Sequence, residues 1–247
     1  MYIHNNYLVI LLKKLLRSFD LKLTKLNDYP SPASMDILKK CFSKNEKIVI
    51  FDVGAHEGQS AQKYHFEFPN ASIYSFEPFK VTYTEILKKN IKNVTPFNIG
   101  FSDEVGSQKF FVNLGSQTNS LLELGTDAQE IWGGFRGLTA EEEVLCEFNT
   151  IDNFMNEQGI SHIDFLKLDV QGAEYKVLRG AAVALTNKKI TLIQLEALIG
   201  EQYVNQKTIA YYLSEMEHYG YKLKNISDIA VVNDNITQVD LIFEAIK

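Results

Sequence analysis

Short apolar runs alternate with amphipathic stretches through most of the chain. The run Lys47–Val53 (KIVIFDV) is apolar on both faces, rich in β-branched residues and followed by glycine, which is typical of a buried parallel strand. This alternation predicts an α/β fold with a doubly wound sheet and right-handed crossovers. The other predicted strands are Ser72–Phe76, Val94–Asn98, His162–Leu168 and Ile190–Leu195, and the predicted helices are Gly58–Glu67, Phe79–Lys89, Gly172–Leu185 and Lys207–Tyr219.

The last part of the chain departs from this alternation. Tyr221–Ile226 and Val239–Ile246 are two predicted strands without a helix between them, joined by a turn-rich stretch around Asn233, so we expect an antiparallel hairpin at one edge of the sheet. Lys109–Asn113 is a further predicted strand. The segment Gly115–Glu143 that follows is too long for a plain connection, and we expect it to fold over a site as a lid or acceptor loop.

Residues 1–46 form a predicted N-terminal helical extension, and residues 47–247 form the main domain. In Tyr7–Leu16 (YLVILLKKLL) the apolar run is too short to span a bilayer, and basic residues follow it instead of preceding it as in a signal peptide. Two interpretations remain. The segment is either an interfacial helix in peripheral contact with a membrane, or a helix packed on the domain or on a second subunit of a homo-oligomer. The second is favoured, because soluble amphipathic helices are far commoner.

Charge and cysteine content narrow the function further. The formal net charge is −6, from 25 Lys and Arg against 31 Asp and Glu. An enzyme that acts on nucleic acid usually presents a basic face, so the charge favours a small or neutral acceptor and no nucleic-acid partner. Cys41 and Cys146 lie far apart in the sequence. With no secretory signal, we expect two free thiols and a cytoplasmic location.

The segment that ends the first strand carries the sharpest chemical pattern. It reads FDVGAHEGQ, with Asp52 at the strand end and the spacing Gly54-x-x-x-Gly58 in place of the G-x-G-x-x-G of a dinucleotide fold. An acid at Asp52 repels a pyrophosphate but suits a ligand with a cationic amino group and a sulfonium. The alternative is a purely structural tight turn capped by Asp52.

Two further segments add candidate ligand contacts. Glu77 ends the second strand just before Pro78, where a carboxylate can accept both hydroxyls of a ribose. After the third strand, Phe101 can pack on an adenine, and Ser102 or Asp103 can bind its exocyclic amine. The alternative for this loop is a plain Asp-containing turn.

Three carboxylates are predicted at one edge of the sheet. Asp169 and Glu196 each end a strand, and Glu174 lies in the first turns of the helix after Asp169. An N-cap role explains Asp169 alone, and a favourable charge near a helix N-terminus explains Glu174 alone. All three together suggest acceptor binding or deprotonation. Asp169 or Glu196 is the candidate base, unless the two hold a Mg²⁺ that orients and acidifies a hydroxyl, and His56 is a further candidate base.

The segments FDVGAHEGQ, YSFEP, GFSDEVG, TNSLL and DFLKLDVQGAEYKVLRGA occur in this order between about Ile48 and Phe243. Together they resemble the FkbM-type methyltransferases. The resemblance implies a class I methyltransferase (Rossmann-like) fold with a seven-stranded sheet whose last strand is antiparallel. It also implies S-adenosylmethionine as cofactor and O-methylation of a sugar, glycan or small metabolite.

The resemblance also implies roles for individual positions. The methionine end of the cofactor is expected near the loop after the first strand, the ribose near Glu77 and the adenine near Ser102 and Asp103. Asn119 and Ser120 match the family's polar motif before the acceptor region, and Asp169 and Glu174 match its second signature. The predicted cofactor-binding residues are Asp52, Gly54, Ala55, His56, Gly58, Gln59, Glu77, Pro78, Gly100, Phe101, Ser102 and Asp103, with Asn119 and Ser120 for the acceptor and Asp169, Glu174 and Glu196 for catalysis.

Two other classes of function stay open on the sequence. A nicotinamide-dependent oxidoreductase is disfavoured by the missing G-x-G-x-x-G, and a non-catalytic interaction module is disfavoured by the intact carboxylates. Methylation of a nucleic-acid base is disfavoured as well, because Asp169-Val170-Gln171-Gly172 stands where D/N-P-P-Y/F is usual.

Overall fold

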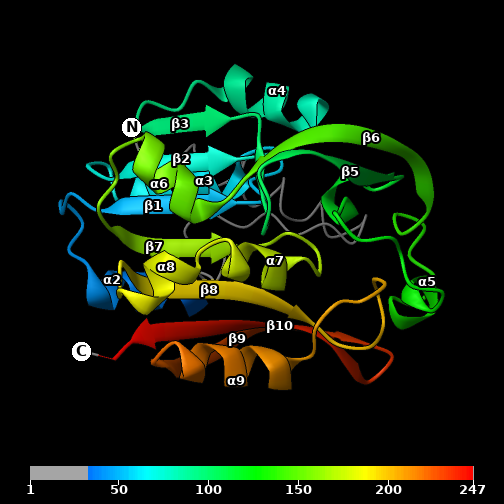
Figure 1. Cartoon of the computed structure of the whole chain (residues 1–247). Helices are drawn as coiled ribbons and strands as arrows, with labels where there is room; N and C mark the ends of the chain where they lie inside the picture. The colour runs from blue at the N-terminus through cyan, green and yellow to red at the C-terminus, as the bar shows by residue number, and fades with distance from the viewer. Residues whose placement is uncertain (1–32, 247) are drawn as a thin grey trace, which may run out of the picture.

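A computed structural model describes residues 33–246 of the chain. Its centre is a seven-stranded sheet in the order β3-β2-β1-β7-β8-β10-β9 (Figure 1). All neighbouring strands pair in parallel except β10, which is antiparallel to β8 and β9. This confirms the class I topology with an antiparallel last strand. The strands are β1 Val49–Val53, β2 Ser72–Phe76, β3 Val94–Phe97, β7 Ile163–Leu168, β8 Ile190–Leu198, β9 Tyr221–Val232 and β10 Asn235–Ala245.

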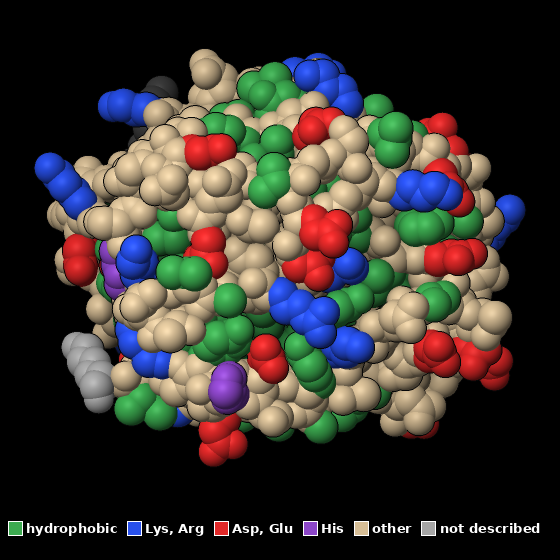
Figure 2. Space-filling view, in the orientation of Figure 1, with side chains coloured by type: hydrophobic (Ala, Val, Ile, Leu, Met, Phe, Trp, Pro, Cys, Tyr) green, Lys and Arg blue, Asp and Glu red, His purple; other side chains and the backbone are tan. Residues whose placement is uncertain are grey.

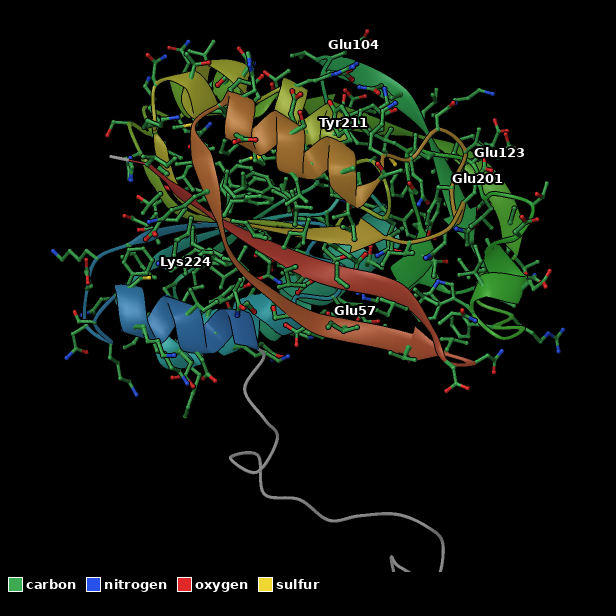
Figure 3. The ribbon with its side chains drawn as sticks, turned by 90° about the horizontal axis from the view of Figure 1, so that it is seen from below. Glu57, Glu104, Glu123, Glu201, Tyr211 and Lys224 are labelled. Carbon is green, nitrogen blue, oxygen red and sulfur yellow. The ribbon has the colours of Figure 1, made fainter. Side chains whose placement is uncertain are left out.

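Helices cover both faces of the sheet, as Figures 1 and 3 show from two directions. Neighbouring residues of one strand, such as Ile50 and Phe51, enter two different apolar clusters because side chains alternate across a strand. The cluster around Ile50 packs against α2 and α3, and the cluster around Phe51 packs against α6 to α9. The helices of the two layers are α2 Ala33–Cys41, α3 Gln59–Glu67, α6 Ile151–Glu157, α7 Glu174–Arg179, α8 Ala182–Thr186 and α9 Ile209–His218, and α4 Lys80–Lys89 packs beside β3.

The single helix predicted over Gly172–Leu185 is wrong in two respects. It begins late, because Gln171 and Gly172 both have a positive φ, of 55° and 89°, which a helix excludes. It is also broken into α7 and α8 around Gly180. A Cβ at Gly180 would lie 2.1 Å from the carbonyl oxygen of Ser102, so the chain passes too close to that loop for a larger residue.

The predicted hairpin at the sheet edge is confirmed, but its strands are longer than expected. They extend to Val232 and from Asn235, which leaves only Asn233 and Asp234 in the turn. Both turn residues have positive φ, 49° and 64°, as a two-residue hairpin of the primed type requires.

A second, three-stranded sheet lies beyond the carboxyl ends of the central strands. It consists of β4 Gly100–Phe101, β5 Gly106–Asn113 and β6 Ala140–Asn149, in the order β4-β6-β5. The sequence indicated part of β5 but not β6. The segment that links them contains the short helices η2 Ser116–Thr118 and α5 Ala128–Ile131.

The expected N-terminal extension falls partly outside the described residues, including Tyr7–Leu16 with both of its interpretations. Its last part forms α2, whose Met35 and Leu38 are buried in the cluster on the α3 face together with Phe42. In the described part of the chain, no helix combines the length and the apolar character needed to cross a bilayer.

Candidate functional site

A cavity of about 270 Å³ lies at the carboxyl ends of β1, β2 and β7, beneath the three-stranded sheet. The strand order reverses between β1 and β7, and ligands of doubly wound sheets bind at such a switch point. Segments far apart in the sequence meet here. Among the residues that line the cavity are Gly54, Ala55, His56, Gln59, Glu77, Pro78, Gly100, Phe101, Ser116, Asn119, Lys167, Asp169 and Gln171.

Close packing shapes the loop after β1. Gly54 has a φ of 76°, and a Cβ added there would lie 1.8 Å from the carbonyl oxygen of Asp169. The backbone N–H groups of Gly54 and Ala55 both donate to the carbonyl oxygen of Phe76, at 3.1 and 3.0 Å. The loop is therefore wedged between the ends of β2 and β7. Gly58, which does not line the cavity, has a φ of 81° and packs on Ile86.

Glu77 is buried in the cavity wall with its carboxylate fixed by two backbone donors. The N–H of His56 donates to Oε2 and the N–H of Phe79 donates to Oε1, each at 2.9 Å. Burial raises the pKa of Glu77 to about 7. Each carboxylate oxygen keeps a further acceptor position, which suits the paired hydroxyls of a ribose.

His56 connects the loop after β1 to the segment above the cavity. Its Nε2 lies 2.8 Å from Oγ of Ser116 in η2, and its Nδ1 lies 3.4 Å from Nε2 of Gln59. Burial lowers the pKa of the imidazole. The contacts place His56 as a neutral link between two walls of the cavity, beside its predicted role in the cofactor loop.

Of the residues after β3 that were predicted to contact an adenine, only some line the cavity. Phe101 is 1% exposed, packs on Phe76 and lines the cavity. Ser102 and Asp103 do not line it. Oγ of Ser102 accepts from the N–H of Glu104 at 3.1 Å, and Oδ1 of Asp103 lies 3.3 Å from Nζ of Lys176. Their contact with an adenine stays a prediction.

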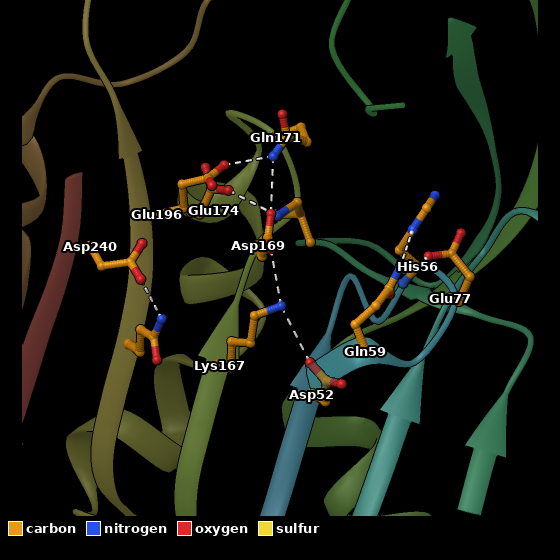
Figure 4. Close-up of polar contacts among 12 residues, drawn as sticks. Asp52, His56, Gln59, Glu77, Lys167, Asp169, Gln171, Glu174, Glu196 and Asp240 are labelled. Carbon is orange, nitrogen blue, oxygen red and sulfur yellow. Dashed lines mark hydrogen bonds and ion pairs between the residues drawn. The ribbon is translucent and has the colours of Figure 1, made fainter. Parts of the chain in front are cut away.

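A buried lysine that sequence reasoning did not single out lies at the centre of the site (Figure 4). Nζ of Lys167 is 3.0 Å from Oδ2 of Asp169 and 3.4 Å from Oδ1 of Asp52. Burial lowers the pKa of the ammonium, but Asp169 and Asp52 outweigh it and hold the pKa well above its usual value. The signal in the sequence was a lysine within the buried run IDFLKL, where lysine is rare unless paired.

Asp52 is fully buried and does not line the cavity, although the sequence suggested contact with a cationic ligand. Burial raises its pKa, and neither carboxylate oxygen has a hydrogen-bond partner among the described residues. Its contact is the ammonium of Lys167, so its role at the ligand stays a prediction.

Asp169 and Glu196 lie close together as predicted, and the side-chain amide of Gln171 bridges them. Nε2 of Gln171 donates to Oδ1 of Asp169 at 3.0 Å and to Oε2 of Glu196 at 2.6 Å. Gln171 is itself held, because Oγ of Ser120 donates to its backbone oxygen at 2.7 Å. Burial raises the pKa of Glu196 well above its usual range, and the negative charge of Asp169 adds to the effect.

Glu174 lies beneath this group and does not line the cavity. Its Oε1 accepts from the N–H of Val170 at 3.0 Å and of Gly172 at 3.4 Å, and Oε2 accepts from the hydroxyl of Tyr212 at 3.4 Å. Burial raises the pKa of Glu174 to about 7. These contacts hold the loop of Asp169 in place, and they favour a positioning role over the catalytic role that the sequence suggested.

The two polar residues expected at the acceptor differ in position. Asn119 lines the cavity, where its Oδ1 accepts from the N–H of Asn113 at 2.8 Å and its buried Nδ2 has no partner among the described residues. Ser120 does not line the cavity and acts on Gln171 instead. Asn119 therefore offers an amide donor to a ligand.

The expectation of a magnesium ion has no support. Within residues 33–246 no group of three or more His, Cys, Asp and Glu side chains is placed to hold a metal. Asp169 and Glu196 converge on the amide of Gln171 instead.

The model of the methyltransferase FkbM domain matches residues 52–223, more than half of the chain. The chain belongs to the FkbM methyltransferase family. Methyltransferase sdnD of Sordaria araneosa is 31% identical over 156 residues, which cover 53% of this chain and 59% of that protein. The 2-O-methyltransferase NoeI of Sinorhizobium fredii is 24% identical over 146 residues, which cover 57% and 60%. This FkbM-family chain thus matches only about three fifths of the length of these curated relatives.

A solved structure supports the fold of the FkbM-family domain. An rRNA methylase from Streptococcus thermophilus superposes with a TM-score of 0.50 over 89% of this chain and 99% of that one, at 9% sequence identity. At this identity the similarity concerns the fold alone.

Proposed function

We propose that this chain is an S-adenosylmethionine-dependent methyltransferase that methylates a hydroxyl of a small molecule or glycan. The observation that carries the proposal is the cavity at the switch point, which is lined by the fixed carboxylate of Glu77 and by the carboxylate of Asp169. Membership of the FkbM family supports it. So does the name of NoeI, a 2-O-methyltransferase, for the choice of oxygen as the methylated atom.

The residues of the cavity fit this cofactor. Glu77 supplies acceptors for the ribose hydroxyls, and the ring of Phe101 supplies an apolar wall for the adenine. The unpartnered Nδ2 of Asn119 is a donor suited to a carboxylate. The tight turn at Gly54 keeps this wall free of side chains.

When bound, the cofactor supplies a methyl group on a positively charged sulfur, and the transfer is an in-line displacement by the acceptor oxygen. The chain's part is to hold that oxygen and take its proton. Asp169 suits the second task, because its side chain is 34% exposed and lines the cavity. Lys167 and Gln171 each hold one of its carboxylate oxygens in place.

Location and assembly complete the proposal. Cys41 and Cys146 are both free, which supports the expected cytoplasmic location. A homo-oligomer and a peripheral membrane contact of the N-terminal segment stay predictions.

Calorimetric titration of S-adenosylmethionine and S-adenosylhomocysteine into the full chain tests the cofactor. We expect the wild type to bind with micromolar affinity and Glu77→Ala to bind at least tenfold more weakly. Glu104→Ala is the matched control, because Glu104 is exposed and its side chain accepts no hydrogen bond in the structure. No binding to the wild type would overturn the proposal.

Transfer of a labelled methyl group to sugar and small-alcohol acceptors tests the chemistry. We expect Asp169→Asn to lower turnover more than a hundredfold and to leave cofactor affinity within a few-fold of the wild type. Unchanged turnover in this variant would remove Asp169 from the role of base.

A further inference from the structure

A second cavity, of about 200 Å³, adjoins the first on the face of the sheet that α2 and α3 cover. It lies where β7, β8 and β10 carry polar side chains, and residues of α2 and α3 form its other walls. Ser60, Lys167 and Asp169 line both cavities. The side chain proposed as base therefore stands on their boundary.

Strand register brings the polar side chains of this cavity to one face. Lys167 of β7 pairs with Gln194 of β8, and Glu196 of β8 pairs with Asp240 of β10. Directly paired residues point to the same side of a sheet. Leu192, two residues before Gln194, and Ile242, two residues after Asp240, belong to the apolar cluster under α2 and α3. The row of polar residues thus sits just beyond the apolar floor of that face.

Carboxyl groups outnumber cationic side chains around the second cavity. Four carboxylates line it, and the cationic side chains that line it are Lys63, which is exposed, and Lys167. Lys167 is already paired with Asp52 and Asp169. The other three carboxylates form no ion pair with any described residue: Glu196, Asp228 and Asp240.

Gln194 supplies an independent sign of a ligand. It is 7% exposed and lines the cavity, and its Nε2 donates to Oδ2 of Asp240. That contact orients the amide so that the oxygen is the free group. Oε1 has no partner among the described residues, and a buried acceptor left without a donor is unfavourable. The cavity therefore lacks a hydrogen-bond donor at Gln194.

We propose that the second cavity binds the methyl acceptor and that this acceptor is a hydroxylated ring with a protonated amine, as in an amino sugar or an aminocyclitol. Its hydroxyls supply donors to the acceptor-rich wall, and its ammonium balances the unpaired carboxylates. The inference rests on the proposed function, since a hydroxyl held beside Asp169 also faces the first cavity. An anionic acceptor would meet the same carboxylates with like charge.

A bound ammonium would favour the charged form of the buried carboxyls on this wall. Burial raises the pKa of Asp240 to about 7, with the charge of Asp169 as the next cause. Burial and the charge of Asp169 raise the pKa of Glu196 as well. A bound ammonium opposes both shifts because it favours the charged carboxylate.

Ligand-observed nuclear magnetic resonance on the full chain tests this selectivity. The probes are glucosamine, glucose and N-acetylglucosamine, which share a ring and differ in charge at one position. We expect glucosamine to bind at least tenfold tighter than the other two. Asp240→Asn should abolish the preference. Asp228→Asn should reduce it, and because Asp228 is exposed, this change should not impair folding. Asp234→Asn, in the exposed hairpin turn, is the control that should change nothing.

Titration of S-adenosylhomocysteine into the same samples separates the two proposals. Equal binding of all three sugars, or none, together with S-adenosylhomocysteine binding would overturn the amine-bearing acceptor and leave the methyltransferase proposal standing. A glucosamine preference that Asp240→Asn and Asp228→Asn leave unchanged would also overturn it, because the amine would then bind elsewhere. Without S-adenosylhomocysteine binding, the proposed function itself fails.

Discussion

Lys167 places one buried ammonium between two carboxylates, and its loss should be costly. In Lys167→Met the side chain keeps an unbranched apolar stem, but Asp52 and Asp169 lose their shared counter-charge. Breaking a buried pair by removing one partner typically costs about 3–5 kcal/mol. We expect a fall of this size in the free energy of unfolding, measured in urea.

The matched control for Lys167 is Lys176→Met. Lys176 pairs with Asp103 through side chains that are 27% and 24% exposed, so its loss should cost about 0–1 kcal/mol. Equal losses in the free energy of unfolding would show that the buried group of Lys167, Asp52 and Asp169 stabilises the fold no more than a partly exposed ion pair does.

Glu77 should make stability depend on pH. Its pKa is about 7 in the folded chain and near 4.5 when exposed, so the folded state keeps a proton that the unfolded state releases between these values. The stabilising contribution is full below pH 4.5 and is lost as pH rises through 7. Between pH 5 and pH 8, ligand-free wild type should lose on the order of 2 kcal/mol more than Glu77→Gln.

Comparing the two proteins isolates Glu77 from the other groups that titrate in this range. Glu174 and Asp240 have raised pKa values of about 7, and His56 has a lowered one, but all three are present in both proteins. Parallel stability curves for the wild type and Glu77→Gln would contradict the prediction.

At the scale of elements, the turn after β1 is fixed by the space available to it. Gly54→Ala introduces both a strained φ and a Cβ that meets the carbonyl oxygen of Asp169 at 1.8 Å. Gly134→Ala introduces a similar φ strain, at 84°, with no atom within 4 Å. The strain alone costs about 1–2 kcal/mol. We expect Gly134→Ala to lose that much, and Gly54→Ala to lose more and also to bind S-adenosylhomocysteine at least tenfold more weakly.

Strands with a continuous apolar pattern could be predicted from the sequence, and strands with a mixed pattern could not. β1, β2, β7 and β8 are mostly buried in the interior of the sheet, so their composition alone indicates them. β6 begins with Ala140–Glu143, four exposed residues, and is held by its pairing with β5. The break between α7 and α8 depends on the close approach of Gly180 to the Ser102 loop, which no local pattern reveals.

In the candidate site, too, some contacts could be predicted from the sequence and others could not. Asp169 and Glu196 could be predicted to meet, because the carboxyl ends of parallel neighbours share one edge. The pairing of Lys167 with Asp52 depends on the exact register of β7 against β1. A one-residue slip in that register would turn either side chain to the opposite face, and sequence periodicity does not fix it.

At the scale of the whole molecule, the first described helix belongs to the core. Leu38 of α2 is fully buried in the cluster formed with α3 and the strands. We expect Leu38→Ala to lower the free energy of unfolding by about 2–5 kcal/mol. Leu87→Ala on α4 is the control, because Leu87 is 46% exposed and should lose far less. Similar losses would mean that α2 is only loosely attached.

Surface charge belongs to the same scale. Figure 2 shows acidic and basic side chains interspersed on one face of the molecule, without a large area of a single sign. This agrees with the modest net charge of −6 over the whole sequence.

The boundary position of Asp169 has a thermodynamic consequence. Its carboxylate faces both cavities, so a ligand in either one alters the electrostatic field in the other. Linkage requires this effect to be reciprocal: whatever factor one ligand applies to the affinity of the second, the second applies to the first. Two positively charged ligands that share one carboxylate bind with negative cooperativity, and a neutral occupant of the first cavity removes that penalty.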